Sequence, residues 1–216
     1  MSTNASLSPI DNPFENESRV VPLPVAEMRD DWLRTLARIP GDGLKGEGFP
    51  RNVLGTIMYN PETFGPFLEY WVTSKSELSL SVREQELVIL RMACLYRSNY
   101  VWKHHVKVGR EFGISDVELD ALRSASFDGS FVPREASLLE VCDELVERRT
   151  LSRESWARHG DVLDTRAFVD LVALVSQYVF FALMNNVMQV QVEEALEDVP
   201  DLGTSLTGGE TSSRKA

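Results

Sequence analysis

Cysteine and histidine are scarce in this chain, which has two cysteines and three histidines among 216 residues. Cys94 and Cys142 form no CxxC motif and have no Cys/His spacing typical of a metal site. Both fall within apolar helical patterns, so we expect buried free thiols, as suits a reducing cytoplasm. Phosphate loops and nucleotide fingerprints are also missing, and the sequence therefore predicts neither a metal site nor a cofactor.

Basic residues are outnumbered: 22 Lys and Arg stand against 33 Asp and Glu, which gives a net charge of -11. Such a chain would repel a phosphate backbone, and no basic stripe with interleaved aromatic residues counters this, so we expect no nucleic-acid partner. The N-terminus, MSTNASLSPIDNPFENES, lacks the basic start and apolar core of a signal peptide. We therefore expect a cytoplasmic protein.

No useful length of the chain alternates as a strand would, and no repeat is visible. With 43% hydrophobic residues the chain is long enough for one proper core. The sequence predicts an all-α protein with one helical domain over 20–200. Residues 1–19 are polar and contain two prolines, and residues 201–216 are rich in Gly, Ser and Thr, so we expect a flexible arm and a disordered tail.

Several helix boundaries are marked by capping signals. Asn60-Pro61 is typical of a helix start, and Ser81 to Glu84 and Ser115 to Glu118 are capping boxes. Gly113 stands where a left-handed residue would end a helix, and the glycine-rich stretch at 39–52 indicates a loop. The expected helices cover about 26–39, from 60 to beyond 71, 81–97, 99–112, 115–122, 133–149, 152–159 and 165–196.

The last predicted helix is long and apolar enough to suggest a membrane span. Polar residues interrupt it, however, and a helix facing lipid would not carry so many of them. We expect instead a core helix that also packs against another subunit, with no membrane partner. The interrupting residues are Asp170, Gln177, Asn185, Asn186, Gln189 and Gln191.

Glu86 and His105 each lie on a helix face that is otherwise apolar. A helical hairpin joined at Arg97–Ser98 can bring the two side chains together. A carboxylate and an imidazole buried side by side form a proton-transfer pair, although a satisfied core pair that only fixes helix register would show the same pattern. Lys103 and His104 lie toward the other side of their helix, and we expect them to face solvent.

The central segment resembles the carboxymuconolactone decarboxylase and alkylhydroperoxidase-like family of all-helical proteins. The resemblance is carried by the run from Arg83 to Ala93, by Tyr100, Trp102 and His105 in a Y-x-W-x-x-H pattern, and by Gly113-Ile114-Ser115. It covers about residues 50–125. It implies the alkylhydroperoxidase-like helical bundle, assembled as a homo-oligomer of three or six subunits.

Two departures from the family pattern bear on the chemistry. Peroxidase members place a CxxC pair before the histidine, and those positions are Ser98 and Val101 in this chain. Because neither side chain can reduce a peroxide, we expect no peroxidase or disulfide-reductase activity. Decarboxylase-like members usually read Y-E-W where this chain has Val101 in the middle position, so a candidate acid or base is replaced by an apolar group.

The resemblance implies a cofactor-independent, decarboxylase-like lyase that acts on a small carboxylated lactone or unsaturated acid. In such a reaction His105 would protonate carbon while Glu86 orients it or takes the proton. Tyr100 would donate a hydrogen bond to the developing oxyanion. Arg91 would hold a substrate carboxylate, and Trp102 would contact the substrate.

Two alternatives remain open from the sequence. The same pocket and proton pair would also suit a cofactor-free isomerase, cyclase or dehydratase, which the replacement at Val101 favours modestly. A non-catalytic helical scaffold or ligand-binding protein would instead keep the Glu/His pair for structural reasons alone.

Overall fold

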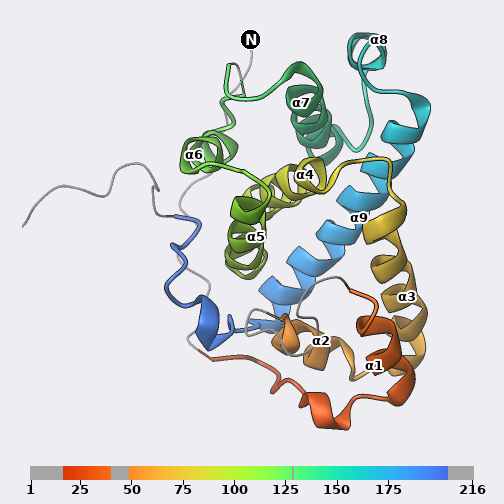
Figure 1. Ribbon diagram of the computed structural model, residues 1–216, viewed down its shortest axis with the longest axis vertical. Coiled ribbons are helices and arrows are strands. Elements are labelled where there is room, and N and C mark those ends of the chain that lie inside the picture. Colours follow the sequence, from red (N-terminus) through yellow and green to blue (C-terminus); the bar gives the residue numbers. More distant parts are fainter. Residues whose placement is uncertain (1–16, 40–48, 128, 204–216) are drawn as a thin grey trace, which may run out of the picture.

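The computed structural model describes residues 17–39, 49–127 and 129–203, and all regular structure in these ranges is helical, as predicted. The long helix α9 (Thr165–Met188) crosses the molecule, and α4 (Val82–Leu95) and α5 (Asn99–Glu111) pack on it (Figure 1). Most of the expected N-terminal arm at 1–19 and C-terminal tail at 201–216 lies outside the described residues. The remaining helices are α1 (Asp30–Leu36), α2 (Arg51–Ile57), α3 (Pro61–Glu77), α6 (Asp116–Ser124), α7 (Pro133–Arg148) and α8 (Arg153–Gly160).

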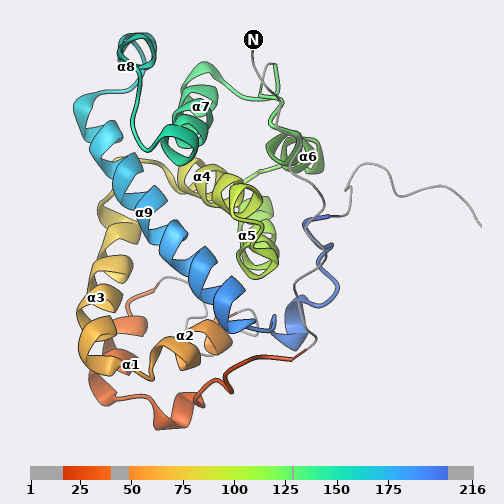
Figure 2. The same cartoon turned by 180° about the vertical axis from the view of Figure 1, so that it is seen from behind.

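These helices divide into two groups at opposite ends of α9. Figures 1 and 2 show α1 and α2 near the C-terminal end of α9, α3 alongside α9, and α7 and α8 toward its N-terminal end. Helix α4 lies between the groups and contacts α5, α6, α7 and α9. Every side chain from Glu84 to Ala93 on α4 is buried, so any polar group on this helix needs a partner from a neighbouring element.

The α4–α5 hairpin forms as predicted. The backbone N–H of Glu84 donates to Ser81 Oγ and the Glu84 carboxylate accepts from the Ser81 N–H, which closes the capping box. After α4, Arg97 adopts a left-handed φ of 52°, and the N–H of Ser98 donates to the carbonyl of Ala93 at 2.9 Å. This is the hydrogen bond of a Schellman turn. It reverses the chain directly, so that α5 returns along α4.

Two further local predictions are confirmed beyond this turn. Gly113 ends α5 with a left-handed φ of 80°, and the capping box at Ser115 begins α6. Gly109 explains how closely α4 and α5 approach: a Cβ atom there would lie 3.2 Å from Leu90 Cδ1 and 3.1 Å from Ile114 Cδ1. A larger residue would require the Leu90 and Ile114 side chains to shift.

Helix α9 has the length and apolar composition of a membrane span, and half of its most apolar window is buried. The buried side packs mainly against α4 and α5 and on α2 and α7, so the fold accounts for much of its apolar character. Exposed apolar side chains remain along it, at Val169, Val172, Leu183 and Val187.

Three sequence predictions of helix extent were wrong. The first helix spans only Asp30–Leu36, and a short 3-10 turn at Val25–Glu27 precedes it. Helix α2 was missed because it is short and directly follows the glycine-rich stretch. Its seven residues are too few to show a helical periodicity in the sequence. The last helix ends at Met188, since Gln189 takes a left-handed φ of 52° and a non-helical segment follows.

Candidate active site

Glu86 and His105 are in contact, as the hairpin predicted. His105 Nδ1 lies 2.7 Å from Glu86 Oε2, and the side chains are 15% and 6% exposed. A carboxylate accepts hydrogen bonds, so Nδ1 carries the proton and Nε2 is the basic nitrogen. Burial lowers the pKa of His105 below its usual value, and the charge of Glu86 opposes that effect without cancelling it. The imidazole is therefore held ready to accept a proton.

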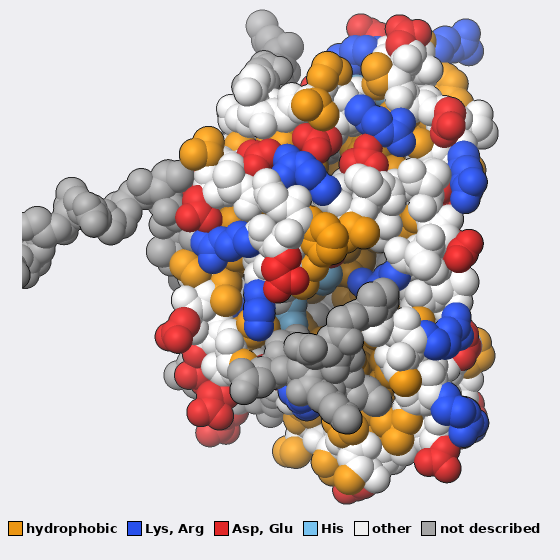
Figure 3. Space-filling view, in the orientation of Figure 1, with side chains coloured by type: hydrophobic (Ala, Val, Ile, Leu, Met, Phe, Trp, Pro, Cys, Tyr) orange, Lys and Arg blue, Asp and Glu red, His pale blue; other side chains and the backbone are white. Residues whose placement is uncertain are grey.

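A cavity of about 500 Å³ opens beside this pair. Figure 3 shows histidine side chains in a hollow on this face of the molecule, bordered by hydrophobic groups. Helices α3, α4, α5 and α9 all contribute to its wall, which is mainly apolar. Its volume is suited to a small organic molecule. Its apolar lining includes Phe49, Val53, Leu54, Trp71, Val101, Val108, Phe112 and Phe181.

Two further polar residues face the cavity near His105 and were not identified from the sequence. The hydroxyl of Tyr178 on α9 lies 3.3 Å from His105 Nε2. Burial, followed by the charge of Glu86, raises the pKa of Tyr178 well above its usual value, so the phenol keeps its proton. Lys75 on α3 also lines the cavity, with its Nζ 5.0 Å from the centre of the Trp71 ring. Burial lowers the pKa of Lys75, although the charge of Glu86 opposes this.

His104, the neighbour of His105, forms a second carboxylate–imidazole pair. Its Nε2 lies 2.6 Å from Glu193 Oε2, and the side chains are 9% and 8% exposed. The expectation that Lys103 and His104 face solvent was wrong, because the segment after α9 covers this side of α5. The pairing could not be predicted, since Glu193 lies in a non-helical segment that carries no periodic pattern.

Tyr100 lines the same cavity, but its hydroxyl has another partner. It donates to Glu193 Oε1 at 2.8 Å, and the ring packs against His104 with centroids 4.5 Å apart. Its proton is thus directed to Glu193. This geometry does not favour the oxyanion role that the sequence suggested for Tyr100, and the hydroxyl beside His105 is that of Tyr178.

The structure does not bring Arg91 or Trp102 to the cavity. Arg91 Nε and Nη2 donate to both carboxylate oxygens of Asp143, at 2.6 and 2.8 Å, and Nη1 donates to the Leu122 carbonyl at 2.6 Å. Trp102 is fully buried, and its indole N–H donates to the carbonyl of Pro200 at 3.1 Å. The suggested substrate-binding roles therefore do not fit, because internal partners already use their polar atoms.

Two buried polar atoms on cavity-lining side chains have no partner in the described part of the chain. They are the amide oxygen of Asn185 and the indole nitrogen of Trp71, which lies near the Tyr178 hydroxyl but makes no well-formed hydrogen bond with it. Nearly all buried polar groups in folded proteins are hydrogen-bonded, so such atoms need an explanation. Water or a ligand in the cavity would be able to supply the missing partners.

The thiols are placed away from this chemistry. Neither Cys94 nor Cys142 lines the cavity. Burial raises the pKa of Cys94 to about 12 and that of Cys142 further still, so neither forms a thiolate at neutral pH. Ser98 and Val101, where the family resemblance would lead one to expect a redox cysteine pair, are a buried serine and an apolar residue of the cavity wall.

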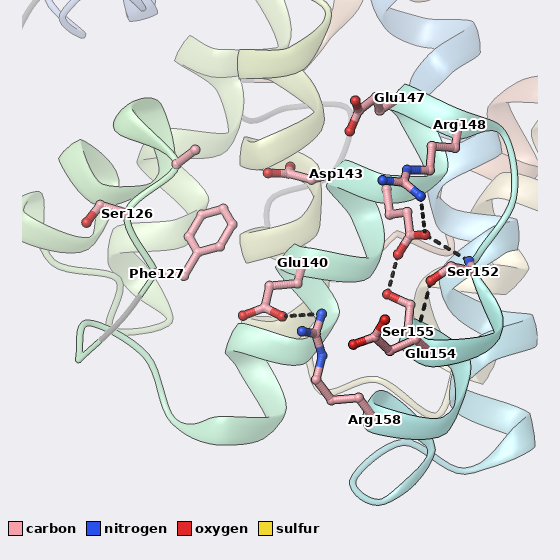
Figure 4. Close-up of a pocket in the computed structure, with 12 residues that line it drawn as sticks. Ser126, Phe127, Glu140, Asp143, Glu147, Arg148, Ser152, Glu154, Ser155 and Arg158 are labelled. Carbon is pink, nitrogen blue, oxygen red and sulfur yellow. Dashed lines mark hydrogen bonds and ion pairs between the residues drawn. The ribbon is translucent and has the colours of Figure 1, made fainter. Parts of the chain in front are cut away.

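A second and larger cleft, of about 710 Å³, lies between α7 and α8. Figure 4 shows that its polar groups are mainly engaged with one another. Glu144 accepts from Ser155 and from the Ser152 N–H, and Arg158 pairs with Glu140 at 3.2 Å. No group of three or more His, Cys, Asp or Glu in the described ranges could hold a metal ion. We therefore take the cavity at Glu86 and His105 as the candidate site.

Comparison with known protein families supports this choice. Residues 61–144 match the model of the carboxymuconolactone decarboxylase family. This segment includes α4 and α5 and therefore both Glu86 and His105. No curated protein matches the chain.

Solved structures share the fold at low sequence identity. The alkylhydroperoxidase AhpD core of an uncharacterized peroxidase-related protein from Ralstonia eutropha JMP134 is 15% identical, with a TM-score of 0.70 over 83% of this chain and 94% of that one. A peroxidase-related protein from Silicibacter sp. TM1040 is 13% identical, with a TM-score of 0.66 over 89% and 98%.

The debrominase Bmp8, as a cysteine-to-alanine variant in complex with 2,3,4-tribromopyrrole, is also 13% identical, with a TM-score of 0.66 over 83% of this chain and 94% of that one. The family match covers the site-bearing hairpin, and the fold is shared along most of the chain. Residues 61–144 are therefore similar to the carboxymuconolactone decarboxylase family, and most of the chain shares its fold with alkylhydroperoxidase-like structures.

Proposed function

We propose that this protein is a cofactor-independent acid–base enzyme that acts on a small unsaturated or lactone-type organic acid in a decarboxylase-like reaction. The observation that carries the proposal is the contact between Glu86 and His105 at the wall of an apolar cavity. A buried acid–imidazole pair beside a space for a small molecule is the arrangement that proton transfer to carbon requires.

Lys75 takes the place that the sequence suggested for Arg91. It lines the cavity together with Lys107, and its charge contributes to lowering the pKa of His105. Its ammonium group would attract an anionic substrate into an otherwise apolar cavity, where an ion pair is stronger than in water. A carboxylate that the substrate keeps throughout the reaction would lie against Lys75.

The chemical step follows from the remaining groups. When the carbon–carbon bond to the departing carboxylate breaks, CO₂ leaves and its bonding electrons form an enolate. The Tyr178 hydroxyl, which keeps its proton, would donate to the enolate oxygen. His105, after taking up a proton at Nε2, would deliver it to the carbanionic carbon. Glu86 would stabilise the imidazolium through Nδ1.

The related structures support a small unsaturated substrate. Bmp8 was solved with 2,3,4-tribromopyrrole, so that protein of the same fold binds a small unsaturated ring. Since the thiols of the present chain lie away from the cavity, we do not extend thiol-dependent chemistry to it. A lyase that needs only proton transfer fits the groups that line the cavity.

His105→Gln tests the proposal, because glutamine keeps a polar side chain but cannot shuttle a proton near neutral pH. Purified protein would be supplied with a panel of carboxylated γ-lactones and unsaturated dicarboxylic acids, and CO₂ release and ultraviolet absorbance would be followed. We expect turnover to fall by roughly 10²- to 10⁴-fold. His159→Gln is the matched control, since His159 does not line the cavity. Turnover at the wild-type rate in His105→Gln would refute the role of His105, and no turnover in any of these proteins would favour the non-catalytic scaffold instead.

The assembly into a homo-oligomer, as a trimer or hexamer, remains a prediction. It is supported by the exposed apolar side chains of α9, which recur at intervals that keep them on one side of the helix at Val169, Val172, Leu183 and Val187. A second subunit that covered this stripe would bury it without altering the cavity residues named above. Light scattering coupled to size-exclusion chromatography would measure the assembly directly.

A further inference from the structure

The cavity has two carboxylate–imidazole pairs, of which the reaction proposed above uses only one. His104 and His105 are consecutive on α5, and both line the cavity. Each is bound by its own buried carboxylate: Glu193 for His104, Glu86 for His105. Consecutive helical residues point about 100° apart, so the two imidazoles reach different parts of the same space.

Glu193 is held firmly by other groups besides His104. Its Oε1 accepts from the Tyr100 hydroxyl at 2.8 Å and from the Asn52 N–H at 2.9 Å, and its Oε2 lies by His104 Nε2. The Tyr100 hydroxyl in turn accepts from the Val53 N–H at 3.4 Å. Burial raises the pKa of Glu193, but these hydrogen bonds outweigh it and hold the pKa below its usual value. Glu193 thus remains an anion that can stabilise an imidazolium.

A structural role alone accounts poorly for this second pair. A buried acid–base pair is often no more stabilising than well-packed apolar residues of similar size, because both groups lose their hydration. In the described part of the chain, no hydrogen bond reaches His104 Nδ1, and that atom is not sealed in the core. The ring therefore has one nitrogen bound to Glu193 and another with no hydrogen-bond partner among the described residues, on a side chain that lines the cavity.

We propose that His104 and Glu193 form a second proton-transfer pair that works with Glu86 and His105 on one substrate, so that the site moves a proton between two carbons. This inference rests on the proposed function of the His105 pair and extends it to an isomerisation. The substrate class is an unsaturated acid or lactone whose double bond lies one carbon away from conjugation with its carbonyl group.

The proton balance of such a reaction closes without a co-reactant. Neutral His105 takes a proton from the carbon next to the carbonyl, and the C–H electrons enter a dienolate. Protonated His104 gives its proton to the carbon two positions further along, and the dienolate electrons form that new C–H bond. The double bond moves into conjugation and the mass is unchanged. Exchange with water then returns both histidines to their starting states.

The test separates the two half-reactions by NMR in D₂O, with β,γ-unsaturated carboxylic acids and β,γ-unsaturated γ-lactones as probes. Deuterium uptake next to the carbonyl reports the His105 step, and the shifted double bond reports the His104 step. We expect His104→Gln to exchange deuterium while isomer formation falls by at least about 100-fold. His105→Gln should lose both signals. Tyr100→Phe keeps the ring but removes one hydrogen bond to Glu193, and should slow only isomer formation, by several-fold.

Three outcomes would overturn the inference, each in a distinguishable way. Isomer formation at the wild-type rate in folded His104→Gln would show that His104 has no part in the reaction. Release of CO₂ without any isomer from the wild-type protein would leave the proposed decarboxylase-like function intact and refute only the second pair. If neither exchange, isomer nor CO₂ depends on His105, both the inference and the proposed function fail.

Discussion

Glu86 and Arg91 lie on the same helix, α4, and are buried to nearly the same degree, with 4% and 6% of their surfaces exposed. Each has an oppositely charged or ionisable partner on another helix: His105 for Glu86, Asp143 for Arg91. The two pairs differ in their surroundings. His105 borders a cavity, whereas the guanidinium of Arg91 is enclosed by Asp143, the Leu122 carbonyl and the Phe127 ring.

This comparison shows that burial of a charge does not identify a functional residue. What distinguishes the two sites is whether the pair keeps an atom that a ligand can reach. The Glu86 pair keeps Nε2 of His105, whose one hydrogen-bond partner among the described residues is the Tyr178 hydroxyl, at a long 3.3 Å. The nitrogens of the Arg91 guanidinium instead all donate hydrogen bonds to Asp143 or the Leu122 carbonyl. Mutating one pair should therefore change activity, and mutating the other should change stability.

Of these two α4 residues, Glu86 should have the larger effect on activity when it is replaced by glutamine. The amide can still accept a hydrogen bond from His105 Nδ1, but it no longer stabilises a positive imidazolium, so we expect turnover to fall about 100-fold with little loss of fold. Turnover on the lactone and dicarboxylate panel would be measured together with thermal unfolding. Glu140→Gln, which removes a carboxylate in the α7–α8 cleft, is the matched control and should leave turnover unchanged.

Arg91→Met should have the opposite pattern. It keeps an apolar stem but leaves the Leu122 carbonyl and Asp143 without their donor. Because Asp143 is 30% exposed and water can partly replace the guanidinium, we expect a loss of about 2–3 kcal/mol in unfolding free energy. Activity per folded molecule should be retained. Chemical denaturation measures the loss.

Arg110→Met provides the matched control for that change, since Arg110 pairs with Asp116 where both side chains are more than 40% exposed. Such pairs contribute less than about 1 kcal/mol. If Arg91→Met abolished turnover while the fold persisted, Arg91 would belong to the site after all, and the contrast between the two α4 residues would fail.

The sequence predicted one member of this comparison well and the other poorly. Glu86 and His105 were identified because both interrupt apolar helix faces on either side of a well-marked turn. The same reasoning could not show what the guanidinium of Arg91 contacts, because its partners lie 31 and 52 residues away in the sequence. Long-range partners leave no mark on local periodicity.

The second histidine shows a different limit. His104 was assigned to solvent because a helix of a globular protein usually has one buried face. Helix α5 is covered on two sides, by α4 and by the segment that follows α9, and the end of α9 at Gln189 was itself not predicted. With that segment expected to be helical, neither Glu193 nor its contact with Tyr100 could be anticipated.

The pH dependence of stability sharpens the comparison, because only one of the two α4 pairs includes a histidine. The groups around His105 are Glu86, Lys75, His104 and Tyr178. Its pKa is lower in the folded protein than the usual value of about 6.5. The unfolded chain therefore binds more protons between these two pKa values, and stability should decline as pH falls through that window.

His105→Gln removes this titration and should flatten the decline. The unfolding free energy would be measured at several values between about pH 5 and pH 8 for wild type and His105→Gln. The difference between the two curves isolates the contribution of His105 to the pH dependence from that of the carboxylates. In the wild type, the proposed decarboxylation needs a proton on His105 Nε2, so turnover should also fall about tenfold per pH unit once pH rises above the folded pKa. An identical pH slope of stability in both proteins would mean that folding leaves the pKa of His105 unchanged.

Trp102→Phe should have the smallest effect, and it tests the assignment of a residue that the family pattern places close to His105. Phenylalanine keeps an aromatic ring in the core but cannot donate to the Pro200 carbonyl, so we expect a loss of about 1–2 kcal/mol from the hydrogen bond and the smaller ring. Since Trp102 does not line the cavity, turnover should stay within about twofold of wild type. A large drop in turnover without a change in unfolding would mean that the anchoring of the 190–203 segment by Trp102 positions Glu193, and thereby links the core of the hairpin to the chemistry of His104.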